Sequence, residues 1–353
     1  MRAPVAILAM LGLAFAARAD YPAVVPGGGL AFPADEGAHP EYRTEWWYVT
    51  GWLAGPNGKP LGFQVTFFRS RPAADDANPS AFAARQVLIG HAALSDPALG
   101  HALHAERIAR AGFGLADAGI GATAVSVGGW QLAAQGDSFV TAVTAADFAF
   151  RLNLARTGPP VANGQGGYSQ KGPAPASASR YYSIPGLRVT GEIVRSGHRE
   201  RVTGEAWLDH EWSSAYLDAD SVGWDWIGLN LADGGSLMAF RIRDRAGNAR
   251  WAGGTLRRPG GAIEVFAPAD IGLRPLRVWR SPHTAISWPV AVGIRAGALD
   301  FTLQPLLDDQ ESDSRLTTGA VYWEGAVEAR AGGRTIGRGY LELTGYGEPL
   351  RLR

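Results

Sequence analysis

The sequence predicts a mostly β protein with two β-domains in tandem. The 353 residues include 47 Gly and 12 Trp, but few stretches in which apolar residues recur with the 3.6-residue period of a helix. Short alternating runs recur instead, each bounded by Gly, Pro, Asn or Asp, as expected of strands and turns. The length exceeds the roughly 250–300 residues at which a single hydrophobic core stops growing, which favours two domains.

The first 19 residues predict a secretory signal peptide. Arg2 precedes an apolar run, and Ala17-Arg18-Ala19 fits the small-residue pattern of a cleavage site. The run is shorter than the roughly 20 residues that a membrane-spanning helix needs, and no later segment comes closer. We therefore expect an exported protein, periplasmic or secreted after cleavage near Ala19, with no transmembrane segment in the mature chain. Without Cys it has no disulfides, so core burial and hydrogen bonds must hold the fold.

Three hairpins follow from strand patterns that flank turn residues. Residues 45–69 read as a strand (EWWYVTGWL), a turn with Asn57-Gly58 and a second strand (GFQVTFFR). Residues 224–243 repeat this plan around Asp233-Gly234, and residues 321–346 form the third hairpin around RAGGR.

The first two hairpins resemble each other, which suggests a duplicated domain. Each opens with a Trp-rich strand and closes with a strand that carries Phe and then Arg. Trp47 and Trp226 are 179 residues apart, about half the mature length. We therefore divide the chain into an N-terminal domain, 20–215, and a C-terminal domain, 216–353, although such hairpins also resemble one another by chance.

Two segments interrupt the strand pattern. Residues 157–179 are rich in Gly, Pro, Ala and Ser, which predicts either a binding loop or lid, or a disordered connector. Residues 79–90 (PSAFAARQVLIG) are the best candidate for a helix, with Phe82, Val87 and Leu88 on one face, although residues 89–94 fit a strand equally well.

The strand at residues 45–53 is apolar on both faces. Alternation places Trp46, Tyr48, Thr50 and Trp52 on one face and Trp47, Val49 and Leu53 on the other. A barrel wall with a lined interior on one side and packed segments on the other satisfies both faces. That interior is either solid core or a ligand chamber, and the polar atoms of Trp and Tyr suit a chamber wall.

The densest group of polar residues lies in GEAWLDHEWSSAY, residues 204–216. Alternation places Trp207, Asp209 and Glu211 on one side of the chain, and Leu208, His210 and Trp212 on the other; nearby, Asp225 lies between Trp224 and Trp226. Acids buried among indoles have raised pKa values, as a proton donor working near neutral pH requires. The alternatives are structural: the acids, like Glu45, pair with arginines, and His210 is a core histidine.

Several function classes lack support. The 33 basic and 33 acidic residues balance without forming blocks, so neither nucleic acid nor an anionic membrane is an expected partner. We expect no metal, since adjacent Asp209 and His210 point to opposite faces, although His101, His104 and Glu106 form another possible set. Ser213 near His210 lacks the G-x-S-x-G context of a hydrolase, and no dinucleotide or phosphate motif indicates a cofactor.

Eight segments carry a resemblance to a known family. They are HPEYRTEWWYVTGWL (39–53), HAALSD (91–96), YYSIPGLRVTG (181–191), GEAWLDHEWSS (204–214), WDWIGLNLADG (224–234), DDQES (308–312), YWEGAV (322–327) and GRGYLELTGY (337–346). Together they resemble the carotenoid 1,2-hydratase (hydroxyneurosporene synthase) superfamily, in its AttH-like branch. The resemblance implies two tandem lipocalin-like antiparallel β-barrels and cofactor-free, acid-catalysed addition of water to, or cyclisation of, an apolar polyene, isoprenoid or lipid.

Alkene hydration needs an acid, aromatic faces that shelter a cation, and a positioned water. We assign catalysis to Asp209 or Asp225 as the acid, His210 as the group that orients the water or the acid, and neighbouring Glu211. The substrate-binding candidates are Glu45, Trp46, Trp47, Tyr48, Trp52, Trp207, Trp212, Trp224, Trp226, Tyr322 and Trp323. The alternative is a non-catalytic periplasmic lipid carrier or an accessory of an ABC-type lipid or lipoprotein export system, as the AttH name suggests; a secreted hydrolase ranks third.

Overall fold

A computed structural model of the chain describes residues 21–56, 58–73 and 78–351. Within them, two complete 3-10 turns are described, Ala34–Glu36 and Pro268–Asp270, and nearly all other regular structure is strand. The all-β prediction is confirmed. The predicted signal peptide lies outside the described residues. No helix in the part of the chain that the structure describes is long and apolar enough to cross a membrane.

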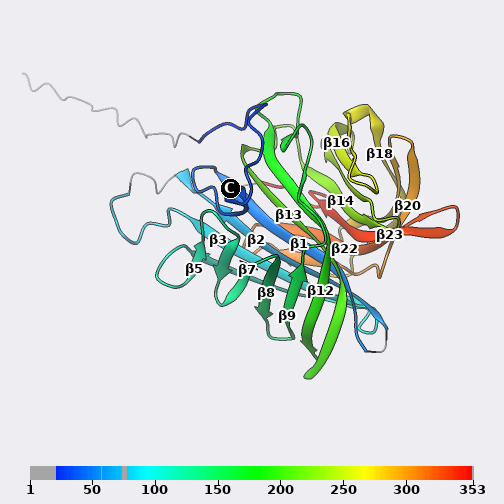
Figure 1. The fold of residues 1–353 in the computed structure, drawn as a ribbon, viewed down its shortest axis with the longest axis horizontal. Coiled ribbons are helices and arrows are strands. Elements are labelled where there is room, and N and C mark those ends of the chain that lie inside the picture. Colours follow the sequence, from blue (N-terminus) through cyan, green and yellow to red (C-terminus); the bar gives the residue numbers. More distant parts are fainter. Residues whose placement is uncertain (1–20, 57, 74–77, 352–353) are drawn as a thin grey trace, which may run out of the picture.

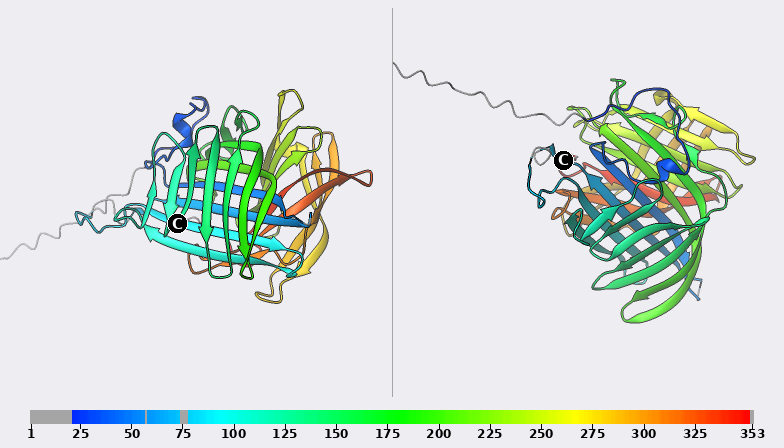
Figure 2. Two further views of the ribbon diagram at one scale, coloured as in Figure 1. Left: turned by 60° about the horizontal axis from the view of Figure 1, so that its bottom comes forward. Right: turned by 60° about the vertical axis from the view of Figure 1, so that its left-hand side comes forward.

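The first sheet contains 13 antiparallel strands and curls into a nearly closed barrel (Figures 1 and 2). Its strands are β1 (Thr44–Ala54), β2 (Pro60–Ser70), β3 (Val87–Asp96), β4 (His101–Arg110), β5 (Ala116–Ala118), β6 (Ala124–Val127), β7 (Trp130–Gln135), β8 (Ser138–Thr144), β9 (Phe148–Ala155), β10 (Val161–Ala162), β11 (Tyr168–Gln170), β12 (Ala178–Arg195) and β13 (His198–Ala215). Their main order in space is β4-β3-β2-β1-β13-β12-β9-β8-β7-β6-β5, so the first and last long strands of the domain are neighbours.

The second sheet contains ten strands and packs against one side of the barrel (Figure 1). Its strands are β14 (Gly223–Leu231), β15 (Ser236–Arg243), β16 (Ala249–Arg257), β17 (Ile263–Phe266), β18 (Ile271–Arg280), β19 (Ser287–Ala296), β20 (Leu299–Pro305), β21 (Glu311–Ser314), β22 (Ala320–Ala331) and β23 (Arg334–Thr344). Their main order is β17-β16-β15-β14-β23-β22-β20-β19-β18.

The two sheets share a plan, but the repeat has a different register from the one read off the sequence. In each sheet the opening hairpin (β1–β2 or β14–β15) lies beside the last strand (β13 or β23). Glu45 lies opposite Arg69 just as Asp225 lies opposite Arg241. Trp226 therefore corresponds to Trp46. The pairing of Trp226 with Trp47 was wrong, because these two residues face opposite sides of their strands.

The three predicted hairpins are confirmed as β1–β2, β14–β15 and β22–β23. The prediction of a helix at residues 79–90 was wrong. Residues 81–86 form turns and bends, and β3 begins at Val87, because pairing of Val87–Asp96 with β2 decides the conformation of a short apolar run that is ambiguous by itself. Residues 157–179 are ordered: β10 and β11 pair with β12, so this segment is part of the sheet's edge.

The barrel interior is filled by its own hydrophobic core, which includes Trp47, Val49 and Leu208. The expected chamber is therefore not inside the barrel. The outer face of β1 and β13 instead packs on the second sheet, where Trp52, Trp207 and Trp226 belong to a third, interdomain cluster. Trp52 Nε1 donates a hydrogen bond across this interface to the Gly339 carbonyl at 3.0 Å.

Gly62 is a point of close approach between the domains. A Cβ at this position would lie 2.8 Å from both Ala326 Cβ and the Tyr340 hydroxyl oxygen. We expect Gly62→Val to lower the free energy of unfolding by about 1–3 kcal/mol, because the sheets must separate to make room. Urea denaturation checks this, with Gly158→Val as control since Gly158 faces open space. Equal stability of the two variants would contradict the packing described.

Candidate functional site

Alternation along β13 divides the predicted site residues between two compartments. Trp207, Asp209 and Glu211 face the second sheet, while Leu208 and Trp212 lie in the barrel core and His210 packs on Trp47. This confirms the sidedness read from the sequence. It also means that Asp209 and His210 cannot act on one ligand together, because the sheet separates their side chains.

Four carboxyl groups meet between the sheets, in what we call the acid chamber. Asp209 and Glu211 come from β13, Glu324 from β22 and Glu342 from β23. They line a cavity of about 40 Å³ together with Trp46, Tyr48, Thr66, Phe68, Tyr216, Trp224, Trp226 and Tyr322. Seven of the eleven predicted substrate-binding residues lie in this interdomain cluster or in the partly buried shell around it: Trp46, Tyr48, Trp52, Trp207, Trp224, Trp226 and Tyr322.

A larger groove of about 510 Å³, the front groove, adjoins the acid chamber. Both are lined by Trp46, Phe68 and Tyr322, so these three aromatic side chains form the boundary between them. The rest of the groove is lined mainly by residues 315–319 and 348–351. A ligand in the front groove can therefore place one end against the chamber.

Asp209 accepts three hydrogen bonds from neighbouring side chains. Its Oδ1 accepts from Ser183 Oγ at 2.5 Å and Trp207 Nε1 at 2.6 Å, and its Oδ2 accepts from the Tyr181 hydroxyl at 2.7 Å. Burial nevertheless raises the pKa of Asp209 to about 7, against the three donors that favour the carboxylate. Near neutral pH, Asp209 is thus present in both its protonated form and its ionised form.

Glu211 is paired with Lys171, a buried lysine from the Gly-rich segment. Lys171 Nζ lies 2.8 Å from Glu211 Oε1 and 4.1 Å from the centroid of the Phe240 ring. The Ser179 hydroxyl also donates to Glu211 Oε1. Burial raises the pKa of Glu211 and lowers that of Lys171, while the charge of each partner opposes both shifts. The ion pair accounts for the burial of both groups.

Glu324 and Glu342 have no ion-pair partner among the residues that the structure describes. They lie directly opposite each other on β22 and β23. Burial raises the pKa of Glu324 to about 8, and burial together with the charge of Glu324 raises that of Glu342 well above its usual range. Burial therefore favours the protonated form of both acids, and Glu324, with a pKa of about 8, is mainly protonated at pH 7 and able to donate a proton.

Sequence reasoning missed these two acids and Lys171. Glu324 and Glu342 are single acids within apolar strands (YWEGAV and YLELTGY), a pattern that usually marks a solvated strand face. Their flanking aromatic residues are a signal that they share with Asp209. Lys171 lies in a segment read as a loop, where nothing predicts burial.

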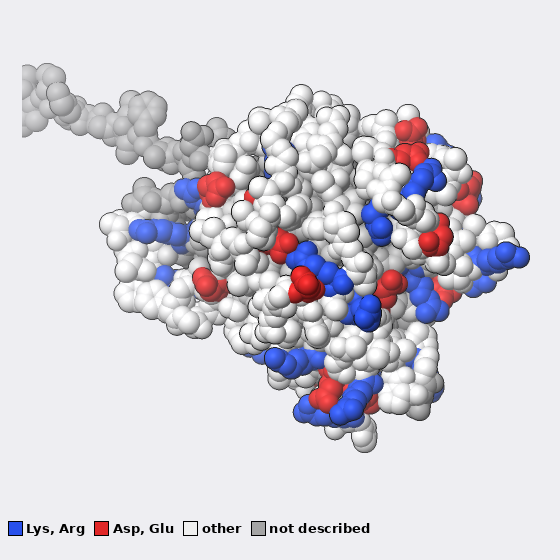
Figure 3. Space-filling view, viewed as in Figure 1, with Lys and Arg blue, Asp and Glu red and all other residues white. Residues whose placement is uncertain are grey.

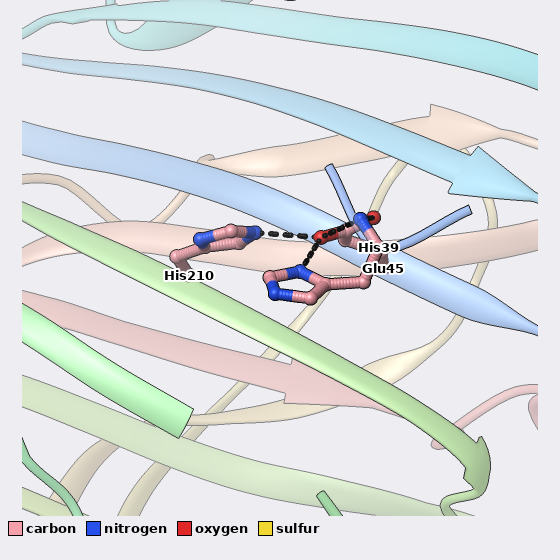
Figure 4. A group of neighbouring side chains, drawn as sticks. All are labelled: His39, Glu45 and His210. Carbon is pink, nitrogen blue, oxygen red and sulfur yellow. Dashed lines mark hydrogen bonds and ion pairs between the residues drawn. The ribbon is translucent and has the colours of Figure 1, made fainter. Parts of the chain in front are cut away.

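Glu45 and His210 belong to a second site, inside one end of the barrel. His39 Nδ1 and His210 Nε2 each lie 2.8 Å from Glu45 Oε1 (Figure 4). Arg69 Nε donates to Glu45 Oε2 at 2.7 Å. His39, Glu45 and His210 are the described residues whose ligand atoms gather closely enough to hold a metal ion. The Glu45 carboxylate already has donors on both oxygens, so this cluster is satisfied as an ion-pair network.

The hydrogen bonds of this network fix its charges. Burial opposes the carboxylate of Glu45, but the hydrogen bonds from His210 and His39 hold the pKa of Glu45 well below its usual range. Burial also opposes the charged form of His39, yet Glu45 and Asp35 raise its pKa. Burial lowers the pKa of His210 despite Glu45. The network is thus an ionised element within the barrel wall.

The remaining predicted residues are parts of the two domain cores. Asp225 points into the second sheet and pairs with Arg241 Nη2 at 2.5 Å and Arg243 Nε at 2.8 Å, the structural alternative weighed from the sequence. Trp323 is in the core of the second sheet, and its Nε1 donates to the Asp308 carbonyl. Trp47 and Trp212 are in the barrel core.

Two other predicted combinations do not assemble. His104 and Glu106 lie near His91 and contact Ser314 and Thr317 of the second domain, whereas His101 is exposed and hydrogen-bonds the Leu99 carbonyl. The Ser213 hydroxyl donates to the Ala178 carbonyl at 2.7 Å.

On the face that Figure 3 draws, basic and acidic side chains are interspersed, in keeping with the equal numbers of basic and acidic residues in the sequence.

The chain matches the family model AttH-like over residues 23–346. It belongs to the AttH-like family. A protein from Nitrosomonas europaea whose crystal structure was assigned to AttH is 48% identical, with 92% of this chain and 99% of that chain covered and a TM-score of 0.87. A search of curated proteins finds no match.

More distant structures share the fold of this AttH-like chain. Kievitone hydratase from Nectria haematococca is 14% identical, with a TM-score of 0.70 and coverage of 93% of this chain and 96% of that one. CghA, crystallised with Sch210972, is 13% identical, with a TM-score of 0.50 and coverage of 93% and 97%. These similarities show a shared fold, and the family match over residues 23–346 confirms the AttH-like membership predicted from the sequence.

Proposed function

We propose that this AttH-like protein adds water to a carbon–carbon double bond of an apolar polyene, isoprenoid or lipid, by acid catalysis in the acid chamber. One observation carries the proposal: Glu324, a carboxyl group whose pKa burial raises to about 8, faces an aromatic cavity at the inner end of the front groove. Protonation of an alkene carbon needs such an acid, and aromatic faces stabilise the resulting cation. The name of kievitone hydratase adds support by analogy of fold.

In this mechanism Glu324 is the proton donor. Its proton adds to one alkene carbon, and the carbocation forms at the more substituted carbon, beside the rings of Trp46, Trp226 and Tyr322. Water then bonds to the cation, and its proton passes to Asp209, whose carboxylate accepts three hydrogen bonds. Return of that proton to Glu324 completes the cycle. This assignment replaces Asp209 and Asp225 as donor candidates, since Asp225 lies outside the chamber.

Cyclisation uses the same first step, with a second double bond in place of water as the nucleophile. A non-catalytic carrier would use the front groove to bind its ligand and would need no proton transfer by the acids. The open groove of about 510 Å³ is as suitable for a carrier as for an enzyme of this class. Such a carrier would act in the periplasm or outside the cell, as an accessory of an export system.

Incubation with acyclic polyenes in water enriched in oxygen-18 tests the function. We expect a product that has gained one water with the heavy oxygen, detected by mass spectrometry. Asp209→Asn should abolish the product and retain ligand binding, measured by quenching of Trp fluorescence. Binding without product in the native protein would instead support the carrier, and neither binding nor product would overturn both.

The pH dependence of the rate follows from the two assigned acids. Asp209 must be ionised, so the rate rises with pH up to its pKa of about 7; Glu324 must be protonated, so the rate falls above about 8. We expect a bell-shaped profile of kcat/KM with its maximum between these values. A rate that keeps rising beyond pH 9 would contradict Glu324 as donor.

A further inference from the structure

Four buried polar atoms with no partner lie together beside the acid chamber. They are the Tyr48 hydroxyl, Thr50 Oγ1, Gln64 Oε1 and Glu324 Oε2, and none has a hydrogen-bond partner among the described residues. Buried polar atoms are nearly always paired, and a group of unpaired ones indicates sites for bound water. Four such atoms at one place need a common explanation.

Strand register places these atoms in one patch. Tyr48 lies opposite Thr66, and Thr50 lies opposite Gln64, on the outer face of β1 and β2. Side chains opposite each other in an antiparallel pair are about 5 Å apart at Cβ. Glu324 joins them from β22, with its Oε1 3.5 Å from Gln64 Nε2. The patch therefore spans the interface between the sheets.

The patch connects two cavities. Tyr48, Thr66 and Glu324 line the acid chamber. Thr50 lines a different cavity of about 290 Å³, the back groove, whose other walls include Trp52, Glu205, Trp207, Asn230 and Arg338. Glu205 and Arg338 are exposed, so the back groove opens to solvent. Along β1 the front groove lies at Trp46 and the back groove at Thr50 and Trp52, with the chamber between them.

We propose that water enters and leaves the acid chamber from the back groove, along the patch formed by Thr50, Gln64, Tyr48 and Glu324. This inference rests on the proposed function, in which each turnover consumes one water. A hydrocarbon in the front groove covers the boundary formed by Trp46, Phe68 and Tyr322, so water needs a second route. The chamber cavity of about 40 Å³ has room for about three waters, by the roughly 10–15 Å³ that each needs.

The route separates the two reactants by chemistry. The front boundary is aromatic, and the back path offers a hydroxyl, an amide oxygen, a second hydroxyl and a carboxyl oxygen in succession. Each can hold a water molecule that bridges to the next. The path ends at Glu324, where the cation forms, so the arriving water is next to the carbon that it attacks.

Thr50→Val tests the route, because it replaces the hydroxyl with a methyl group of the same shape. The matched control is Thr141→Val, a buried threonine of β8 whose hydroxyl bonds to the Gln131 carbonyl within the barrel. High-resolution crystal structures should contain ordered water bridging Thr50, Tyr48 and Glu324 in the native protein and in the control. In Thr50→Val at least one of these waters should be lost.

Rates and affinities complete the test. We expect water addition to slow about tenfold in Thr50→Val, the effect of one lost hydrogen bond, with polyene affinity unchanged. Tyr48→Phe serves as a second variant should Thr50→Val not fold. The inference is overturned if the four atoms pair directly with protein groups without intervening water, or if both variants keep the waters and the native rate. If no polyene is hydrated the proposed function fails, and the crystallographic waters still decide the route.

Discussion

Glu324→Gln is expected to lower the rate of water addition by at least about a hundredfold, the lower end of what general-acid catalysis contributes. Gln keeps the shape of the neutral carboxylic acid but has no proton of comparable acidity. Because Glu324 is already mainly protonated at pH 7, the substitution should leave polyene affinity unchanged and the free energy of unfolding within about 1 kcal/mol of native.

The matched control is Glu328→Gln, four residues along the same strand. Glu328 pairs with Arg338 at the surface, outside the chamber, and should keep the native rate. Both variants replace a carboxyl group by an amide on the same strand, one inside the chamber and one outside it. A native rate in Glu324→Gln, or an equal loss in both, would remove Glu324 from the mechanism.

Glu45→Gln is expected to have the largest effect on stability, about 3–5 kcal/mol, the cost of leaving buried charge without its partner. Glu45 is fully buried and accepts from His39, His210 and Arg69, so an amide at this position leaves Arg69 unpaired in the barrel. Urea denaturation at pH 7 measures the loss. Glu192→Gln, at the exposed pair with Arg199, should cost under about 1 kcal/mol.

The pH dependence of this effect has a definite sign. The pKa of Glu45 is lowered on folding, so its stabilisation is complete above its unfolded value of 4.5 and is lost as pH falls through its folded value. The difference in the free energy of unfolding between the native protein and Glu45→Gln should thus become smaller below about pH 4.5. A gap that stays constant down to pH 2 would mean that Glu45 is not the ionised centre of this network.

The sequence allowed the sidedness of the strands to be predicted, but not what covers them. Alternation alone placed Trp46 and Tyr48 on one face of their strand and Trp47 on the other face. In the same way it placed Asp209 and His210 on opposite faces of their strand. It could not identify the second sheet as the cover, since the contact between Gln64 and Glu324 joins residues 260 positions apart. The two apolar faces of the first strand were therefore predicted, and of the two alternatives for the barrel interior, solid core and ligand chamber, the structure shows the solid core.

The acids of the site were harder to assign than its aromatic walls. Asp209 and Asp225 look alike in sequence, each between two tryptophans, and alternation puts both on strands. Two arginines of β15 make Asp225 part of a structural ion-pair group, while burial raises the pKa of Glu324 to about 8. Protonation depends on such surroundings and not on the residue's immediate neighbours in the chain.

The protonation state of Glu324 tests the account most directly, and it can be measured without knowing the substrate. Infrared difference spectra between the native protein and Glu324→Gln at pH 7 show which form of this carboxyl group is lost. The account predicts loss of a protonated carboxylic acid band, which converts to carboxylate as pH rises through about 8. Loss of a carboxylate band at pH 7 would mean that the chamber contains no proton donor at this position, and the proposed chemistry would fail with it.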